Sequence, residues 1–169
     1  RVGDAFWQRQ GGTERLCPLG GADRAAAFHT ALYRALDGAG AILHLTDPDV
    51  VAVSMSGRPL RPLLDDLAQI AGTELVCLTA CGLSEILRGL RRHGAVLLRG
   101  AGALCAGSSR EEAQAAARLL RKGCLARRFA QAVPGCRPLR REDAALQRLF
   151  YVTKYAKRKT GGSEPWGRS

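Results

Sequence analysis

The chain has few aromatic residues and no long apolar run. Its 169 residues include 2 Trp, 3 Tyr and 4 Phe, too few for the aromatic platforms on which single-stranded nucleic acids stack. No apolar segment approaches the roughly 18 residues that would span a bilayer. Charged residues are scattered through the first 16 positions, unlike a secretory signal. These absences predict a globular, cytoplasmic domain with no membrane span.

Acidic residues are also scarce. The 15 Asp and Glu stand against 26 Lys and Arg, giving a net charge of +11. Such a balance fits nucleic acid or an acidic partner. Charge alone is a weak signal, and the aromatic residues give no support to nucleic acid. The densest basic cluster is Lys154, Lys157, Arg158 and Lys159. We therefore expect binding to nucleic acid less than binding to an acidic partner.

No pair of cysteines has the Cys-x-x-Cys spacing of redox or zinc motifs. There are 6 cysteines, and Cys77 and Cys81 are separated by three residues rather than two. Several lie in apolar runs, where free Cys behaves as a small hydrophobic residue. The sequence favours a reduced, cytosolic protein whose cysteines hold no metal.

Hydrophobic periodicity and turn residues predict alternating helices and strands. We expect strands at 41–45, 74–78, 95–98 and 104–105, and helices at 23–36, 63–71, 84–92, from 108 or 109 to 133, and at 141–150. Ser108 and Glu111 have capping-box spacing at the start of the longest helix. This alternation is typical of the α/β class.

The length fits one domain, and both ends differ from it in composition. Residues 1–21 are Gly-rich and are expected to be irregular, and residues 157–169 are expected to form a flexible basic tail. The domain proper is therefore predicted at 22–156.

Four segments, in order, resemble motifs of the class II aldolase/adducin family. They are Phe28–Tyr33 (FHTALY), Ala41–Pro48 (AILHLTDP), Ala95–Gly102 (AVLLRGAG) and Gly107–Ala113 (GSSREEA). The resemblance implies a three-layer α/β/α sandwich with a central, mainly antiparallel sheet. It also implies a homo-oligomer, because enzymes of the family tend to form cyclic tetramers. Those enzymes hold zinc through three histidines, two from His-x-His and one from Asn-His-Gly.

Two of the three metal positions are lost in this chain. The resemblance assigns the first histidine of His-x-His to His44, the second to Thr46, and that of Asn-His-Gly to Ala101. A catalytic zinc site needs about three protein ligands. His93 precedes its strand and should lie at the end of that strand away from the turn. We therefore expect no cofactor and a catalytically inactive domain, a pseudoenzyme with a binding or scaffolding role as in adducin.

Two other interpretations remain open. In the first, a rearranged site with His44 and Asp47, and Asp49 as a further ligand, holds Zn and supports a lyase or epimerase acting on a small sugar-phosphate-like substrate. Tyr33, four residues after His29, is a further catalytic candidate, although packing is the commoner role of such a pair. Arg99, Gly100 and Gly102 are candidates for holding an anion. In the second, the chain is an electrostatic module for nucleic acid or an acidic partner.

Overall fold

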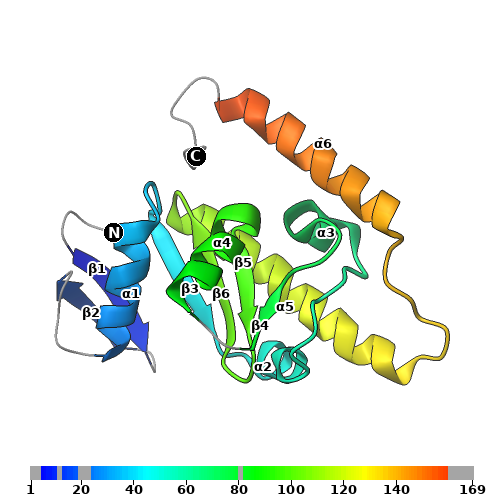
Figure 1. The fold of residues 1–169 in the computed structure, drawn as a ribbon, viewed down its shortest axis with the longest axis horizontal. Helices are drawn as coiled ribbons and strands as arrows, with labels where there is room; N and C mark the ends of the chain where they lie inside the picture. Colours follow the sequence, from blue (N-terminus) through cyan, green and yellow to red (C-terminus); the bar gives the residue numbers. More distant parts are fainter. Residues whose placement is uncertain (1–4, 11–12, 19–23, 80–81, 160–169) are drawn as a thin grey trace.

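The computed structural model describes residues 5–10, 13–18, 24–79 and 82–159, with side chains from residue 27 to residue 154. A four-stranded sheet forms its centre (Figure 1), in the order β3 (Ala41–Leu45), β6 (Gly102–Gly107), β5 (Ala95–Leu98) and β4 (Cys77–Leu78). β6 pairs antiparallel with both β3 and β5, whereas β4 runs parallel to β5. The predicted α/β class with a mainly antiparallel sheet is confirmed.

Helices cover both faces of this sheet. Because successive strand residues point to opposite faces, Leu97 and Cys105 belong to one core cluster and Val96 and Leu104 to the other. The first cluster is closed by α2 (Pro48–Met55), α3 (Asp65–Ala71) and α5 (Arg110–Ala132), and the second by α1 (Arg24–Ala35) and α4 (Leu83–His93). The result is the predicted three-layer sandwich.

The expected strands at 41–45 and 95–98 have the predicted bounds. The strand expected at 74–78 is shorter, because Leu75 pairs with Leu60 in an isolated antiparallel bridge and only Cys77–Leu78 joins the sheet. The segment that follows β3 forms the short helix α2. Its first residue is Pro48, whose fixed φ and missing N–H suit the first turn of a helix.

The start of α5 differs from the predicted capping box by one residue. Ser109 is the N-cap, and its hydroxyl accepts a hydrogen bond from the Glu112 N–H at 3.2 Å. The Glu112 carboxylate in turn accepts from the Ser108 N–H at 2.8 Å. The pairing of Ser108 with Glu111 was therefore wrong. Because two serines and two glutamates are adjacent, the capping box could pair Ser108 with Glu111 or Ser109 with Glu112. The path of the chain out of β6 decides between these two pairings.

At both ends of the chain the structure differs from the secondary structure predicted from the sequence. Within the segment expected to be irregular, β1 (Ala5–Gln10) and β2 (Thr13–Pro18) form an antiparallel pair that satisfies backbone hydrogen-bonding groups. Residues 1–4, 11–12 and 19–23, which include the predicted first residue of the helix at 23–36, lie outside the described residues. α6 (Arg141–Lys159) continues past its predicted end at Phe150, so residues 157–159 of the expected tail are helical. No helix among the described residues is long and apolar enough to cross a membrane.

Candidate functional site

The structure places His44 against the turn between β5 and β6. His44 is the exposed fourth residue of β3, and its Nε2 lies 2.7 Å from the carbonyl oxygen of Ala101. The two residues are 57 positions apart in sequence. The imidazole therefore hydrogen-bonds to the backbone of the residue that the resemblance assigns to a lost metal ligand.

Backbone conformation and packing explain why this turn contains glycines. Gly102 has φ +92°, and a Cβ atom there would lie 1.9 Å from the Leu45 carbonyl oxygen, so no side chain fits. Gly100 has φ +71°, and its N–H donates to the Ser54 hydroxyl at 3.2 Å. The turn is closed by the Ala101 N–H, which donates to the Leu98 carbonyl at 3.0 Å. The backbone donor that we expected to hold an anion is engaged within the protein.

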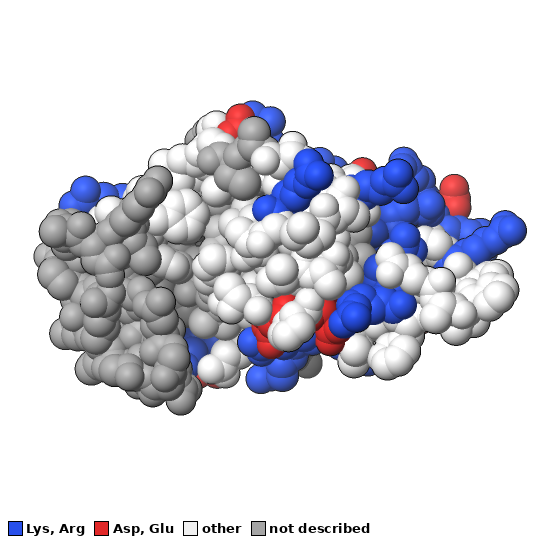
Figure 2. Space-filling model, turned by 90° about the horizontal axis from the view of Figure 1, so that it is seen from below, with Lys and Arg blue, Asp and Glu red and all other residues white. Residues whose placement is uncertain are grey.

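The acidic candidates are paired with α5 rather than with His44. The Asp47 carboxylate forms an ion pair with Arg121 Nε at 2.9 Å, and Asp49 pairs with Arg128. Both pairs link the start of α2 to α5. The basic side of α5 therefore carries ion pairs. Figure 2, seen from below, shows a small acidic group beside gathered Lys and Arg.

The residues present do not fit a zinc ion. Thr46 and Ala101 are exposed beside His44 but offer a hydroxyl and a methyl group in place of imidazoles. In the described part of the chain, no group of three His, Cys, Asp or Glu side chains could hold a metal. Burial raises the pKa of the Cys105 and Cys124 thiols to about 12, which leaves them protonated and unsuited to ligation.

α1 contributes His29 and Tyr33, which have different surroundings. Tyr33 is buried, and its hydroxyl accepts a hydrogen bond from the Ile42 N–H at 2.9 Å. Burial raises the pKa of Tyr33. Burial also lowers the pKa of His29, and the nearby charge of His44 lowers it further. His29 is thus the neighbour of His44 that the sequence reasoning did not identify. The spacing between His29 and Tyr33 suggested a pair within the helix, not an electrostatic interaction with a residue of β3.

Arg99 also has a structural partner. Its Nε donates at 3.3 Å to the carbonyl of Met55, the last residue of α2. A cation at that position is favoured by the negative end of the helix dipole. His93 lies at the opposite end of β5, as its position before that strand predicted. His44, Asp47 and Arg99 therefore each have a separate partner.

Comparison with known proteins agrees with this architecture. Residues 13–127 match the family described as Class II Aldolase and Adducin N-terminal domain. Among proteins with curated descriptions, none matches the chain in sequence. The family match covers most of the chain, so this protein belongs to the class II aldolase/adducin family.

Solved structures share the fold. L-fuculose 1-phosphate aldolase from Glaciozyma antarctica superposes with a TM-score of 0.67 and 21% identity, over 92% of this chain and 71% of the other. L-fuculose-1-phosphate aldolase from Thermus thermophilus gives 0.58 and 26%, over 76% and 75%. An aldolase II superfamily protein from Pseudomonas syringae gives 0.59 and 24%, over 89% and 69%.

Proposed function

We propose that this chain is a metal-free, catalytically inactive class II aldolase-like domain with a binding or scaffolding role. The observation that carries the proposal is the set of donors around His44. Thr46 and Ala101 occupy the two other ligand positions implied by the resemblance, and the His44 imidazole is hydrogen-bonded to the Ala101 carbonyl. Free cysteines in the described part, among them buried Cys77 and Cys105, support a reducing, cytoplasmic setting.

The chemistry of the family explains why this donor set argues against catalysis. A carbanion beside a carbonyl forms readily only if the developing negative charge on the oxygen is stabilised, and a metal ion supplies that in the family's enzymes. A single exposed imidazole gives a small fraction of this stabilisation. The carboxylate candidate Asp47 is neutralised by Arg121. We therefore derive no metal-dependent step for this chain.

Elemental analysis of purified protein tests the proposal directly. After incubation with zinc and desalting, we expect far less than one zinc per chain, and we expect the same from His44→Ala. Stoichiometric zinc that is lost in His44→Ala would overturn the proposal and indicate a rearranged site.

The alternative of a lyase or epimerase is favoured by one observation: two of the structural relatives are named L-fuculose 1-phosphate aldolases. It is tested by turnover of L-fuculose 1-phosphate and related phosphorylated ketoses, with and without added zinc. Because His44, Asp47 and Arg99 have separate partners, we expect no turnover above a His44→Ala control. Turnover that disappears in that control would replace the scaffold proposal with the enzymatic one.

A binding role needs a partner, and two kinds are consistent with the chain. The family resemblance favours a homo-oligomer, with a tetramer as the expected form. The net charge of +11 favours an acidic partner. Binding to an acidic partner should weaken steeply as salt is raised, because salt screens charge pairs at the surface. A flat salt response would remove the electrostatic interpretation.

A further inference from the structure

The contact between α6 and the body of the domain contains a half-buried histidine. Arg148 of α6 reaches the last turns of α3 and α4, and His93 is the last residue of α4. We infer that protonation of His93 releases α6 from this contact, so that the helix is an acid-sensitive arm on an otherwise intact domain. The contact lies at the opposite end of β5 from the turn beside His44, and the inference does not depend on whether the domain is catalytic.

The side chain of Arg148 ties α6 to both helices. Its guanidinium donates to the Gln69 carbonyl at 2.8 Å and to the Arg92 carbonyl at 3.0 Å. These carbonyls belong to the last turns of α3 and α4, where the helix dipole favours a cation. The aliphatic part of Arg148 lies against Gly72, the C-cap of α3. One side chain of α6 therefore joins two helix ends.

Little other burial holds α6 in place. Among its described side chains Ala144 alone is buried, at 1% exposed, on the side of the helix that contacts α3. By contrast, α3 and α4 contribute leucines and isoleucines to the two core clusters. Segments with few buried apolar contacts open at a lower free energy than the core. α6 can therefore leave while the sheet and the helices that cover it stay folded.

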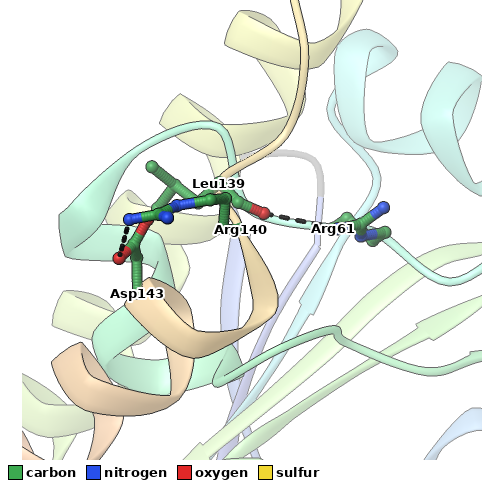
Figure 3. Close-up of polar contacts among 4 residues, drawn as sticks. All are labelled: Arg61, Leu139, Arg140 and Asp143. Carbon is green, nitrogen blue, oxygen red and sulfur yellow. Dashed lines mark hydrogen bonds and ion pairs between the residues drawn. The ribbon is translucent and has the colours of Figure 1, made fainter.

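The segment that leads into α6 is anchored separately (Figure 3). The Leu139 N–H donates to the Pro62 carbonyl at 2.9 Å, and Arg61 donates to the Leu139 carbonyl at 3.3 Å. Arg140 forms an ion pair with Asp143 at 2.8 Å. These contacts lie at the first turn of the helix and include no histidine. They keep the start of α6 in place, so the helix pivots there when its other contact is lost.

The surroundings of His93 favour its neutral form. Its Nδ1 is buried and, within the described part of the chain, has no hydrogen-bond partner. The charges that act on the ring are those of Arg92 on α4 and Arg148 on α6, and both are positive. α3 contributes the backbone of Ile70, whose opposite effect is the smallest of these. A proton on the ring would therefore leave a buried donor without an acceptor, next to two cations.

The acidic groups near this contact have other partners. Glu74 pairs with Arg141 at 3.5 Å, and Asp143 pairs with Arg140. Neither carboxylate is among the groups that shift the pKa of His93. The remaining titratable group is Tyr151, whose ring lies 6.0 Å from the guanidinium carbon of Arg148. No carboxylate in the described part of the chain therefore compensates a charge on His93.

The sign of the pH dependence follows from the shift at His93. Burial, then Arg92 and then Arg148 lower its pKa from 6.5 to about 4, so the docked state binds the proton less readily than the open state. Docking is therefore complete above pH 6.5 and weakens as the pH falls toward 4. A shift of this size limits the change in the docking equilibrium to about 300-fold. Because solvent screens a half-buried ring and Arg92 stays on α4, we expect roughly a tenfold rise of the open form at about pH 5.

Hydrogen exchange of the full chain, read by mass spectrometry at about pH 7.5 and pH 5 and corrected for the intrinsic rates, tests the inference. Peptides from α6 should open roughly tenfold more at the lower pH, whereas peptides from β5 and β6 should not change. His93→Gln should remove this rise, because the amide takes up no proton. His29→Gln is the matched control, since His29 is also a half-buried histidine of lowered pKa but belongs to α1, and it should keep the rise.

Two more variants separate this mechanism from other effects of acid. Glu74→Gln removes the charge that pairs with Arg141 at every pH and should keep the rise. Arg148→Gln removes the two hydrogen bonds to the helix ends and should open α6 already at neutral pH, with a smaller acid dependence. The inference is overturned by equal protection of α6 at both pH values, by a rise that persists in His93→Gln, or by a rise of the same size in β5 and β6. None of these outcomes changes the zinc content of the protein, so this inference and the proposed function fail separately.

Discussion

Restoring the missing imidazoles should create a zinc site. In the double variant Thr46→His/Ala101→His, the two exposed positions beside His44 would supply the ligands that the family resemblance assigns to them. Because both positions are exposed, the larger rings need displace no core residue. We expect the variant to bind one zinc ion per chain with tetrahedral geometry and an open fourth position.

The expected gain in affinity follows from the number of ligands and from the bond that His44 makes now. Structural zinc sites with four ligands are worth about 10–16 kcal/mol, or roughly 3 kcal/mol per ligand. Two added ligands therefore contribute about 6 kcal/mol, from which about 1 kcal/mol is lost when His44 gives up its hydrogen bond to Ala101. The difference corresponds to roughly three to four orders of magnitude in the dissociation constant.

Competition with a chromophoric zinc chelator measures this change, and zinc-dependent melting temperature gives an independent readout. The matched controls are each single histidine variant and the double variant that also carries His44→Ala. If the double variant bound zinc no better than wild type, the assignment of positions 46 and 101 to the lost ligands would be refuted. Equal, stoichiometric binding by wild type and double variant would refute the metal-free interpretation itself.

Three further predictions concern the scaffold of the domain. Tyr33→Phe should lower the free energy of unfolding by about 1–3 kcal/mol in denaturant titration, because it leaves the Ile42 N–H unsatisfied in the core; a change near zero would contradict this. Gly102→Ala should cost more than about 3 kcal/mol or prevent folding, since its Cβ would meet the Leu45 carbonyl, whereas Gly38→Ala has open space and should cost only the strain of its positive φ. The pKa of His93 is lowered from 6.5 to about 4 by burial, then by Arg92 and Arg148, against a smaller opposite effect of a hydrogen bond to the Ile70 backbone. The unfolded chain therefore takes up a proton more readily than the folded one. Because solvent partly screens this half-buried ring, stability should fall by up to about 2 kcal/mol as the pH drops from 6.5 to about 4. In His93→Gln this fall should be smaller, and an unchanged profile would show that another group is responsible.

The sheet was predictable because its signals are local. Continuous apolar runs set the bounds of β3 and β5, and the glycines around Ala101 placed the turn. The resemblance to the family assigned His44 and Ala101 to neighbouring positions, and the structure shows a hydrogen bond between them although 57 residues separate them in sequence.

What could not be predicted depends on contacts between distant parts of the chain. Asp47 and Asp49 look like free carboxylates in sequence, and their partners Arg121 and Arg128 lie 74 and 79 residues away. The length of α6 was underestimated because its last residues are rich in Lys and Arg, a composition that the sequence analysis assigned to a tail. The β1–β2 pair was not predicted because its segment is Gly-rich, a composition typical of irregular structure.

The close approach of Gly102 to β3 makes packing decide the residue at position 102, whereas it leaves the residue at position 101 unrestricted. The glycine is dictated by the Leu45 carbonyl beneath it, so finding a glycine there in another protein indicates how two strands pack and says nothing about activity. Ala101, one residue earlier, is exposed and meets no such restriction. A substitution at position 101 is therefore compatible with this architecture, and the proposed loss of a metal ligand there requires no change in how the two strands pack.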